Sequence, residues 1–421
     1  MLKAIAQRIG LILLGVLFAF IIGEIGVRVL GFAPSELYTY DPYVGWKLKP
    51  NASGWQTHEG RAFVSINSDG FRGPDYSIQK PPGTLRVAVV GDSFTEGQQV
   101  PFDDTFCMVA QKILQAHCPF QFVGKDGKPR IIDRVEVMNF GCDGYGTAQE
   151  LITLKRWAWK YSPDIVVLMF FNGNDMRNNS VVLEGDKCRP FYVYHDGKFV
   201  LGGPFEDDWL FRAHCMMRFE SRHSRLLDLI GAGKKVLVHI IRAPYDHVQT
   251  RKNRKHPPHG VELGLNDVIF APPKTPVWVD AWRVTDAEVE MMNENVKRHG
   301  AIFILATAGT GIQDDPSAKM RENYMKYVGA TNLFYPDDHL KALGEKDGFD
   351  VLNLPEPMQA YAQAHNVSLH GFPNTSPGVG HWNEIGHRLA GELLAQRIRT
   401  LIEAQPAATA PSGPDSTAAP K

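Results

Sequence analysis

Ser93 stands directly after the apolar run at residues 87–90, in the sequence Val-Ala-Val-Val-Gly-Asp-Ser. A run of this kind predicts a buried strand. Ligands of open α/β sheets bind beyond the carboxyl ends of the strands, so Ser93 is a candidate nucleophile for acyl transfer. A serine at this place could also simply turn the chain and cap the next helix. The assignment therefore depends on its partners.

Acyl transfer by serine also needs a base and hydrogen-bond donors for the oxyanion. Gly144 lies in a glycine-rich turn that could bring backbone N–H groups close to a substrate oxygen, and the Asn174 side chain could donate from its amide. His381 precedes the last predicted helix and could return over the sheet to Ser93 as a base. Gly144 could instead only permit a turn and Asn174 only cap a loop, and His387 is expected to be structural.

The elements that must position these residues follow an alternating pattern. Apolar strands at 87–90, 134–139 and 164–171 are separated by helical segments, which predicts a parallel, doubly wound sheet. Later elements are strands at 301–306 and 350–354, a helix at 285–298, and a last helix at 384–402 with Asn383 as its N-cap.

The rest of the chain divides by composition. Residues 1–32 are predicted to be a short cytoplasmic segment with a transmembrane signal-anchor, and residues 33–82 an extension rich in turns. The sheet domain is predicted at 83–402, interrupted by a large insertion at about 176–284. Residues 403–421, rich in Ala, Pro, Ser and Thr, are predicted to be a disordered tail.

The N-terminal apolar stretch is long enough to cross a membrane. A helix from Ile9 to Leu30 would be roughly 33 Å long. Lys3 and Arg8 precede it, which favours a cytoplasmic N-terminus. The alternative is a cleaved signal peptide, but no convincing small-x-small cleavage site follows. We therefore expect a single-pass protein of the bacterial plasma (inner) membrane, with the remaining chain on the periplasmic or extracellular side.

Composition sets further limits. The formal net charge is −1 and the pI about 6.9, so the basic surface expected of a nucleic-acid-binding protein is missing. The five cysteines contain no C-x-x-C pair and neither require nor exclude disulfides. His256 and His259 lie near a basic run at 251–256 but have no evident third partner, so no metal is expected, and no cofactor. The chain also has no G-x-S-x-G elbow, P-loop or H-E-x-x-H motif.

Four blocks together resemble the SGNH (GDSL-type) hydrolase superfamily, in particular its membrane-anchored extracytoplasmic bacterial members. Residues 91–93 (Gly-Asp-Ser) are similar to its nucleophile block and residues 139–144 to its glycine block. Residues 173–175 (Gly-Asn-Asp) and 381–387 are similar to its asparagine and histidine blocks. The segment Asn-Ser-Asp-Gly-Phe-Arg-Gly at 67–73 also resembles these members.

This resemblance implies a three-layer α/β fold of the flavodoxin-like type. It implies Ser93 as nucleophile, His381 as general base, and an oxyanion hole made by the N–H groups of Ser93 and Gly144 and the side chain of Asn174. The implied activity is a serine esterase that removes acyl groups, O-acetyl above all, from a carbohydrate or cell-envelope glycan. The alternatives are an O-acyltransferase acting on an exported polysaccharide and a non-catalytic glycan-binding protein.

Two positions depart from the family pattern. Asn172 stands where the asparagine block usually has glycine. The family also usually has an Asp two or three residues before the base, where this chain has Val379 and Gly378. Either a backbone carbonyl or a distant carboxylate orients His381, leaving a Ser-His dyad or an incomplete triad, or catalysis is weakened or lost. The glycine-rich loop is also expected to be more flexible.

Overall fold

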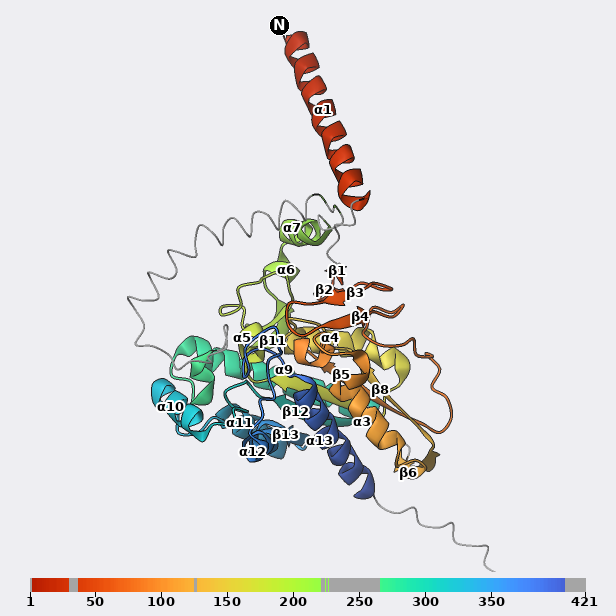
Figure 1. Ribbon diagram of the computed structural model, residues 1–421, viewed down its shortest axis with the longest axis vertical. Coiled ribbons are helices and arrows are strands. Elements are labelled where there is room, and N and C mark those ends of the chain that lie inside the picture. Colours follow the sequence, from red (N-terminus) through yellow and green to blue (C-terminus); the bar gives the residue numbers. More distant parts are fainter. Residues whose placement is uncertain are drawn as a thin grey trace, which may run out of the picture.

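A five-stranded parallel sheet forms the centre of the molecule in a computed structural model (Figure 1). The structure describes residues 2–29, 37–124, 127–220, 224, 226 and 266–405. The strands are β5 (Thr84–Gly91), β8 (Arg134–Asn139), β9 (Ile165–Phe171), β12 (Ile302–Ala308) and β13 (Asp350–Asn353). Their spatial order is β13-β12-β9-β5-β8, which in chain order is the 2-1-3-4-5 arrangement of doubly wound flavodoxin-like sheets. The predicted fold class is confirmed.

The central strands are apolar because helices cover both faces of the sheet. Every residue of β5 and β9 is buried, as expected for parallel strands. Val87 lies opposite Val137 of β8 and Ile165 of β9. Val87 and Val89 face one core cluster, while Ala88 and the neighbouring valine face the other. The alternation along β5 therefore supplies both cores.

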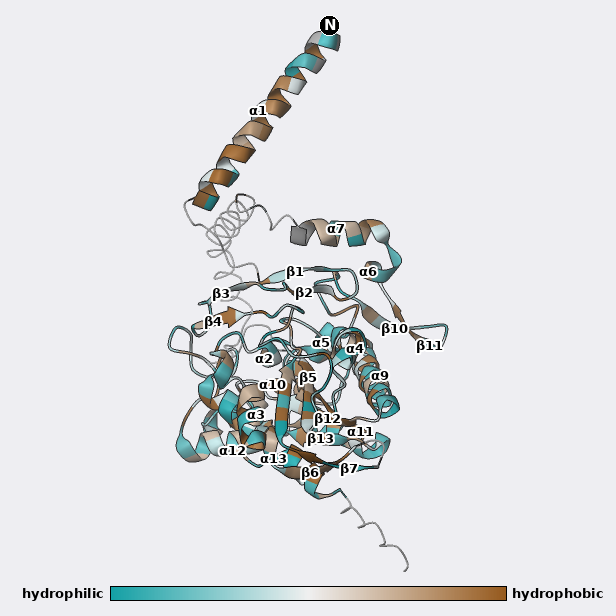
Figure 2. Cartoon of the chain, turned by 90° about the vertical axis from the view of Figure 1, so that its right-hand side faces the viewer, coloured by the Kyte–Doolittle hydropathy of each residue, from teal (hydrophilic) through white to brown (hydrophobic). Residues whose placement is uncertain are grey.

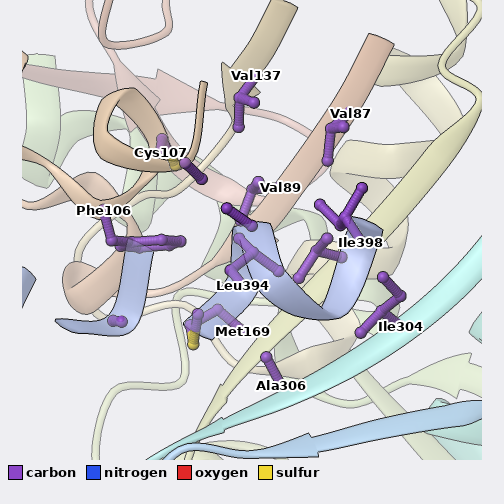
Figure 3. Packing of buried hydrophobic residues seen from close by; sticks show 14 of the residues in the cluster. Val87, Val89, Phe106, Cys107, Val137, Met169, Ile304, Ala306, Leu394 and Ile398 are labelled. Atoms are coloured by element: carbon purple, nitrogen blue, oxygen red, sulfur yellow. The ribbon is translucent and has the colours of Figure 1, made fainter. Parts of the chain in front are cut away.

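Helices form a layer on each side of this sheet. The first layer contains α3 (Phe106–Gln115), α12 (Pro355–His365) and α13 (Glu384–Glu403), and the second contains α4 (Thr147–Arg156), α9 (Pro276–His299), α10 (Ala318–Val328) and α11 (Tyr335–Asp347). Figure 3 shows Leu394 and Ile398 of α13 packed toward Val87 and Val89 of the sheet. The sheet edge that carries the candidate residues is thus held between two packed layers.

The N-terminal helix α1 (Leu2–Val29) projects away from the body of the molecule (Figures 1 and 2). Its stretch Gln7–Val29 has a mean hydropathy of 2.5 and is long and apolar enough to span a bilayer. Two antiparallel hairpins follow, built by β1 (Tyr38–Asp41) with β2 (Gly45–Leu48) and by β3 (Ser53–Gln56) with β4 (Ala62–Ser65). A third and smaller core, which includes Trp46 and Tyr145, joins these hairpins to the sheet domain.

The region predicted as an insertion contains its own small elements. They are α5 (Asp175–Asn178), the hairpin of β10 (Phe191–His195) with β11 (Lys198–Gly202), α6 (Pro204–Asp207), α7 (Trp209–Glu220) and the 3-10 turn η4 (Asp267–Phe270). A disulfide joins Cys188 to Cys215 of α7. The helix predicted from residue 285 begins already at Pro276, where proline at its first position favours helix initiation.

The remaining short elements are α2 (Ser93–Glu96), the 3-10 turns η1 (Phe102–Asp104) and η2 (Ala158–Tyr161), and the hairpin of β6 (Phe120–Val123) with β7 (Pro129–Ile132). The basic run at 251–256, His259 and most of the tail predicted at 403–421 lie outside the described residues.

Candidate active site

Ser93 is the first residue of α2, directly after β5. Asp92 caps this short helix, because its carboxylate accepts a hydrogen bond of 2.9 Å from the N–H of Phe94. Gly91 has no space for a side chain, since a Cβ there would lie 2.1 Å from Oγ1 of Thr95. The tight turn fixes Ser93 at the carboxyl edge of the sheet, 5% exposed.

The loop before α13 brings His381 to this serine. The distance from its Nε2 to Ser93 Oγ is 2.8 Å. Asn383 caps α13 by accepting from the N–H groups of Ile385 and Gly386, so the predicted N-cap is confirmed. His381 also packs against the ring of Phe94, with 5.0 Å between ring centroids. The candidate nucleophile and the candidate base are therefore within hydrogen-bond reach.

A third side chain completes the site, and sequence reasoning missed it. Glu59 Oε2 lies 2.6 Å from His381 Nδ1, and Oε1 accepts from the backbone N–H of His381 at 2.6 Å. Glu59 is in the loop between β3 and β4, in the extension that precedes the sheet domain. The expectation of a Ser-His dyad or incomplete triad is therefore wrong. Of the two groups considered for orienting His381, a backbone carbonyl and a distant carboxylate, the structure has the distant carboxylate.

Contacts between the two loops hold Glu59 in place. The side chain of Asn374 donates to the carbonyls of Thr57 and Gly60 and accepts from the N–H of Gly60. Gly380 leaves room for the carboxylate, because a Cβ at this position would lie 1.9 Å from Glu59 Oε1. The glycine immediately before His381 is thus the one signal in the sequence that points to a group packed against this loop.

The histidine loop is also fixed from the other side, so the expectation of a flexible glycine-rich loop is not supported. Buried His370 contacts the carbonyl of Gly380 through Nδ1 at 2.7 Å and Asp314 through Nε2 at 3.1 Å. The N–H of Gly371 donates to the carbonyl of His381. These hydrogen bonds hold the loop in place despite its glycines.

Gly144 and Asn174 lie in the turns that follow β8 and β9, the strands on either side of β5. Gly144 has φ of +73°, a conformation that glycine adopts without strain. Asn174 precedes α5, and its Oδ1 is buried without a hydrogen-bond partner in the described part of the chain. Asn178 of α5 donates to the carbonyl of Tyr145 at 3.2 Å, which ties the two elements together.

The nucleophile helix is bonded to the same glycine turn. Glu96 of α2 accepts from the N–H of Asp143 at 2.7 Å and from the hydroxyl of Tyr38 at 2.9 Å. Arg72, from the segment 67–73, donates to the carbonyls of Glu96 and Val100. The family-like segment thus supports the chain just after Ser93.

Burial and hydrogen bonding shift the pKa values of the titratable groups around the site. Burial lowers the pKa of His381, but the hydrogen bond and charge of Glu59 outweigh this effect and raise it overall. Burial raises the pKa of Glu59, and its contacts with His381 bring it below the usual value. Burial raises the pKa of Asp92 to about 7. The Glu59–His381 pair therefore favours the form with a carboxylate and an imidazolium.

Two further predicted positions have structural surroundings. His387 is buried beside Phe106, and burial lowers its pKa to about 3, so it is neutral at pH 7. Asn172 is fully buried and donates to Asp337 at 2.9 Å, which accounts for asparagine in place of the family glycine. Within the described ranges, no three His, Cys, Asp or Glu side chains are grouped so that they could hold a metal ion.

No family model and no curated protein matches the chain. Similar solved structures include the acetyl xylan esterase AlAXEase, with 13% identity over 75% of this chain and 100% of that chain and a TM-score of 0.36. A lipase/acylhydrolase from Enterococcus faecalis has 13% identity over 77% and 100%, with a TM-score of 0.33. A putative lipolytic protein from Desulfitobacterium hafniense has 12% identity over 74% and 98%, with a TM-score of 0.33. The last protein is described as a member of the G-D-S-L family.

Proposed function

We propose that this chain is a serine esterase that works through an acyl-enzyme. One observation carries the proposal: Ser93, His381 and Glu59 form a continuous hydrogen-bonded chain at the carboxyl edge of the sheet. Ser93 Oγ attacks the ester carbonyl while His381 Nε2 takes its proton. His381 then gives that proton to the leaving alcohol, and water releases the acyl group by the same steps.

Glu59 has the role of the third member. Its carboxylate holds the proton of His381 on Nδ1, so that Nε2 is the nitrogen free to accept from Ser93. It also stabilises the imidazolium that forms during attack. A carboxylate bonded to His381 supports a catalytic protein over the alternative of a non-catalytic glycan-binding protein.

The oxyanion is expected to lie between the turn at Gly144 and the start of α5. The N–H groups of Ser93 and Gly144 and the amide of Asn174 are the proposed donors. Support comes from the bonds that connect their elements, through Glu96 and through Asn178. Preorganised donors of this kind act without moving during the reaction.

The proposed substrate is an acylated carbohydrate, O-acetylated above all, outside the cytoplasm. Helix α1 is suited to anchor the chain as a single-pass protein of the inner membrane. The disulfide between Cys188 and Cys215 supports an oxidising compartment, where such bonds persist. Both observations favour an exported substrate such as a cell-envelope glycan.

Labelling with a fluorophosphonate tests the nucleophile. The full-length protein should be modified at Ser93, and Ser93→Ala should lose both the label and the hydrolysis of p-nitrophenyl acetate. Full esterase activity in Ser93→Ala would overturn the proposal. Adding a glycan acceptor and measuring how the acyl group divides between water and sugar separates hydrolysis from transfer.

A further inference from the structure

Arg189 has a buried guanidinium next to the candidate active site, and two of its nitrogens form no hydrogen bond within the described part of the chain. Arg189 is 4% exposed. Its Nε and Nη1 atoms are buried and have no hydrogen-bond partner among the residues that the structure describes. Burying a charge without pairing it is costly. An arginine kept in this state needs a reason.

The guanidinium lies beside the proposed oxyanion glycine. A Cβ built on Gly144 would be 3.9 Å from Arg189 Nη2 and 3.5 Å from Cζ2 of Trp46. The guanidinium carbon is also 4.8 Å from the centroid of the Trp46 ring. Trp46 is itself fixed, because its indole N–H donates to the carbonyl of Asp143 at 3.0 Å. Arg189 therefore borders the turn where the substrate carbonyl is expected.

Nearby acidic side chains make other contacts. Glu184 accepts from the N–H of Asp186 and lies 3.8 Å from Nε of Arg177. Asp186 accepts from the N–H of Cys188 at 2.9 Å. Burial lowers the pKa of Arg189, and the negative charges of Glu184, Asp186 and Asp143 offset part of this shift.

The disulfide keeps this arginine in place. Cys188, its direct neighbour, is bonded to Cys215 of α7, and the carbonyl of Cys188 lies so close to Gly45 that a Cβ there would be only 2.0 Å away. The backbone before Arg189 is thus clamped between α7 and the β1–β2 hairpin. A fixed guanidinium suits recognition of a planar anion.

We propose that Arg189 binds a carboxylate carried by the acylated substrate, so that the esterase prefers O-acyl esters of uronic acid residues. The inference rests on the proposed function. One cation that already faces the negative charges of Glu184, Asp186 and Asp143 favours a singly charged group over a doubly charged phosphate. The carboxylate forms a charge-assisted hydrogen bond to Nη2, the guanidinium nitrogen nearest Gly144, while the ester carbonyl lies at the turn of Gly144.

Kinetics with matched substrates tests this preference. The wild type should cleave an O-acetylated methyl glucuronoside with a kcat/KM about 10- to 100-fold above that for its neutral methyl ester, the range of a charge-assisted hydrogen bond. Arg189→Met should abolish this difference, mainly through KM. Exposed Arg283→Met on α9 is the control and should behave as wild type. Equal kcat/KM for the two sugars in the wild type would overturn the proposal, as would a stronger preference for an O-acetylated sugar phosphate.

Binding to an inactive variant separates the two proposals. Calorimetry with Ser93→Ala should give tighter binding of the acetylated uronoside than of its methyl ester, and no such difference with the double variant Ser93→Ala, Arg189→Met. If the wild type is not labelled by the fluorophosphonate at Ser93, the proposed esterase activity is contradicted. Normal labelling without discrimination between the sugars contradicts only the role of Arg189.

Discussion

The carboxylate of Glu59 lies 2.6 Å from Nδ1 of His381, although the two residues are 322 positions apart in the chain. A second oxygen of the same carboxylate bonds the backbone N–H of His381. The two contacts fix both the ring and the backbone of the base. The extension before the sheet domain thus contributes a side chain to the site, and the loops at the edge of the central sheet do not supply this carboxylate.

Replacing Glu59 by glutamine should lower kcat strongly. The amide keeps the shape of the side chain but removes its negative charge. That charge stabilises the imidazolium of His381 and holds the proton on Nδ1. By analogy with other serine triads, we expect a fall of roughly 100- to 10,000-fold, with little change in KM. Esterase assays with p-nitrophenyl acetate measure it. Glu322→Gln, a matched change at an exposed position of α10, should have wild-type activity. A loss of less than threefold in Glu59→Gln would show that Glu59 has no such role.

The pH profile should report the same pair. The pKa of His381 is raised above its ordinary value of 6.5, and the base must be neutral to accept a proton. Activity should therefore fall as pH drops through this raised pKa, with the midpoint of the acid limb of kcat/KM above 6.5. Glu59→Gln removes the charge that raises the pKa, so its acid limb should move to lower pH. An unmoved limb would mean that another group sets the profile.

Removing the side chain of Asn174 should reduce the rate without preventing folding. If its amide donates to the oxyanion, Asn174→Ala should lose roughly 100- to 1,000-fold in kcat, the range found for single oxyanion donors. Asn174→Asp, which replaces the donor by a like charge, should be at least as impaired. Circular dichroism should show native helix content in both. A kcat within twofold of wild type in Asn174→Ala would remove this residue from the proposed oxyanion hole.

His370 should act on the base through Gly380. It is 1% exposed and connects Asp314 to the carbonyl that precedes His381. His370→Ala would leave the Asp314 carboxyl, whose pKa burial raises, without this partner, which should lower the free energy of unfolding by about 2–4 kcal/mol. His370→Gln keeps one polar contact and should recover part of both stability and kcat. Equal losses in the two variants, measured by urea unfolding and by esterase assay, would contradict a positioning role.

The sequence predicted the sheet well because its signals are local. The apolar strand at 87–90 and the helix after Asn383 follow from hydrophobic periodicity and capping alone. Glu59 could not be found in this way, because it lies on a polar hairpin loop whose contact with His381 exists only in the folded chain. Gly380 reflects that contact, because a side chain there would collide with Glu59. From sequence alone, however, a glycine before a histidine indicates a flexible loop as readily as a closely packed neighbour.

Breaking the disulfide should lower stability and loosen the segment before Arg189. Cys188 and Cys215 are 27 positions apart, and closing a loop of this length stabilises the folded state by about 3 kcal/mol. Replacing both by alanine should lower Tm while Ser93 still reacts with a fluorophosphonate, because the disulfide lies outside the triad. Cys107→Ala, at a buried free cysteine of α3, controls for loss of a sulfur from the core. Protein made in a reducing cytoplasm should resemble the double variant and regain the wild-type Tm on oxidation, and an unchanged Tm in the double variant would show that the bond adds no stability.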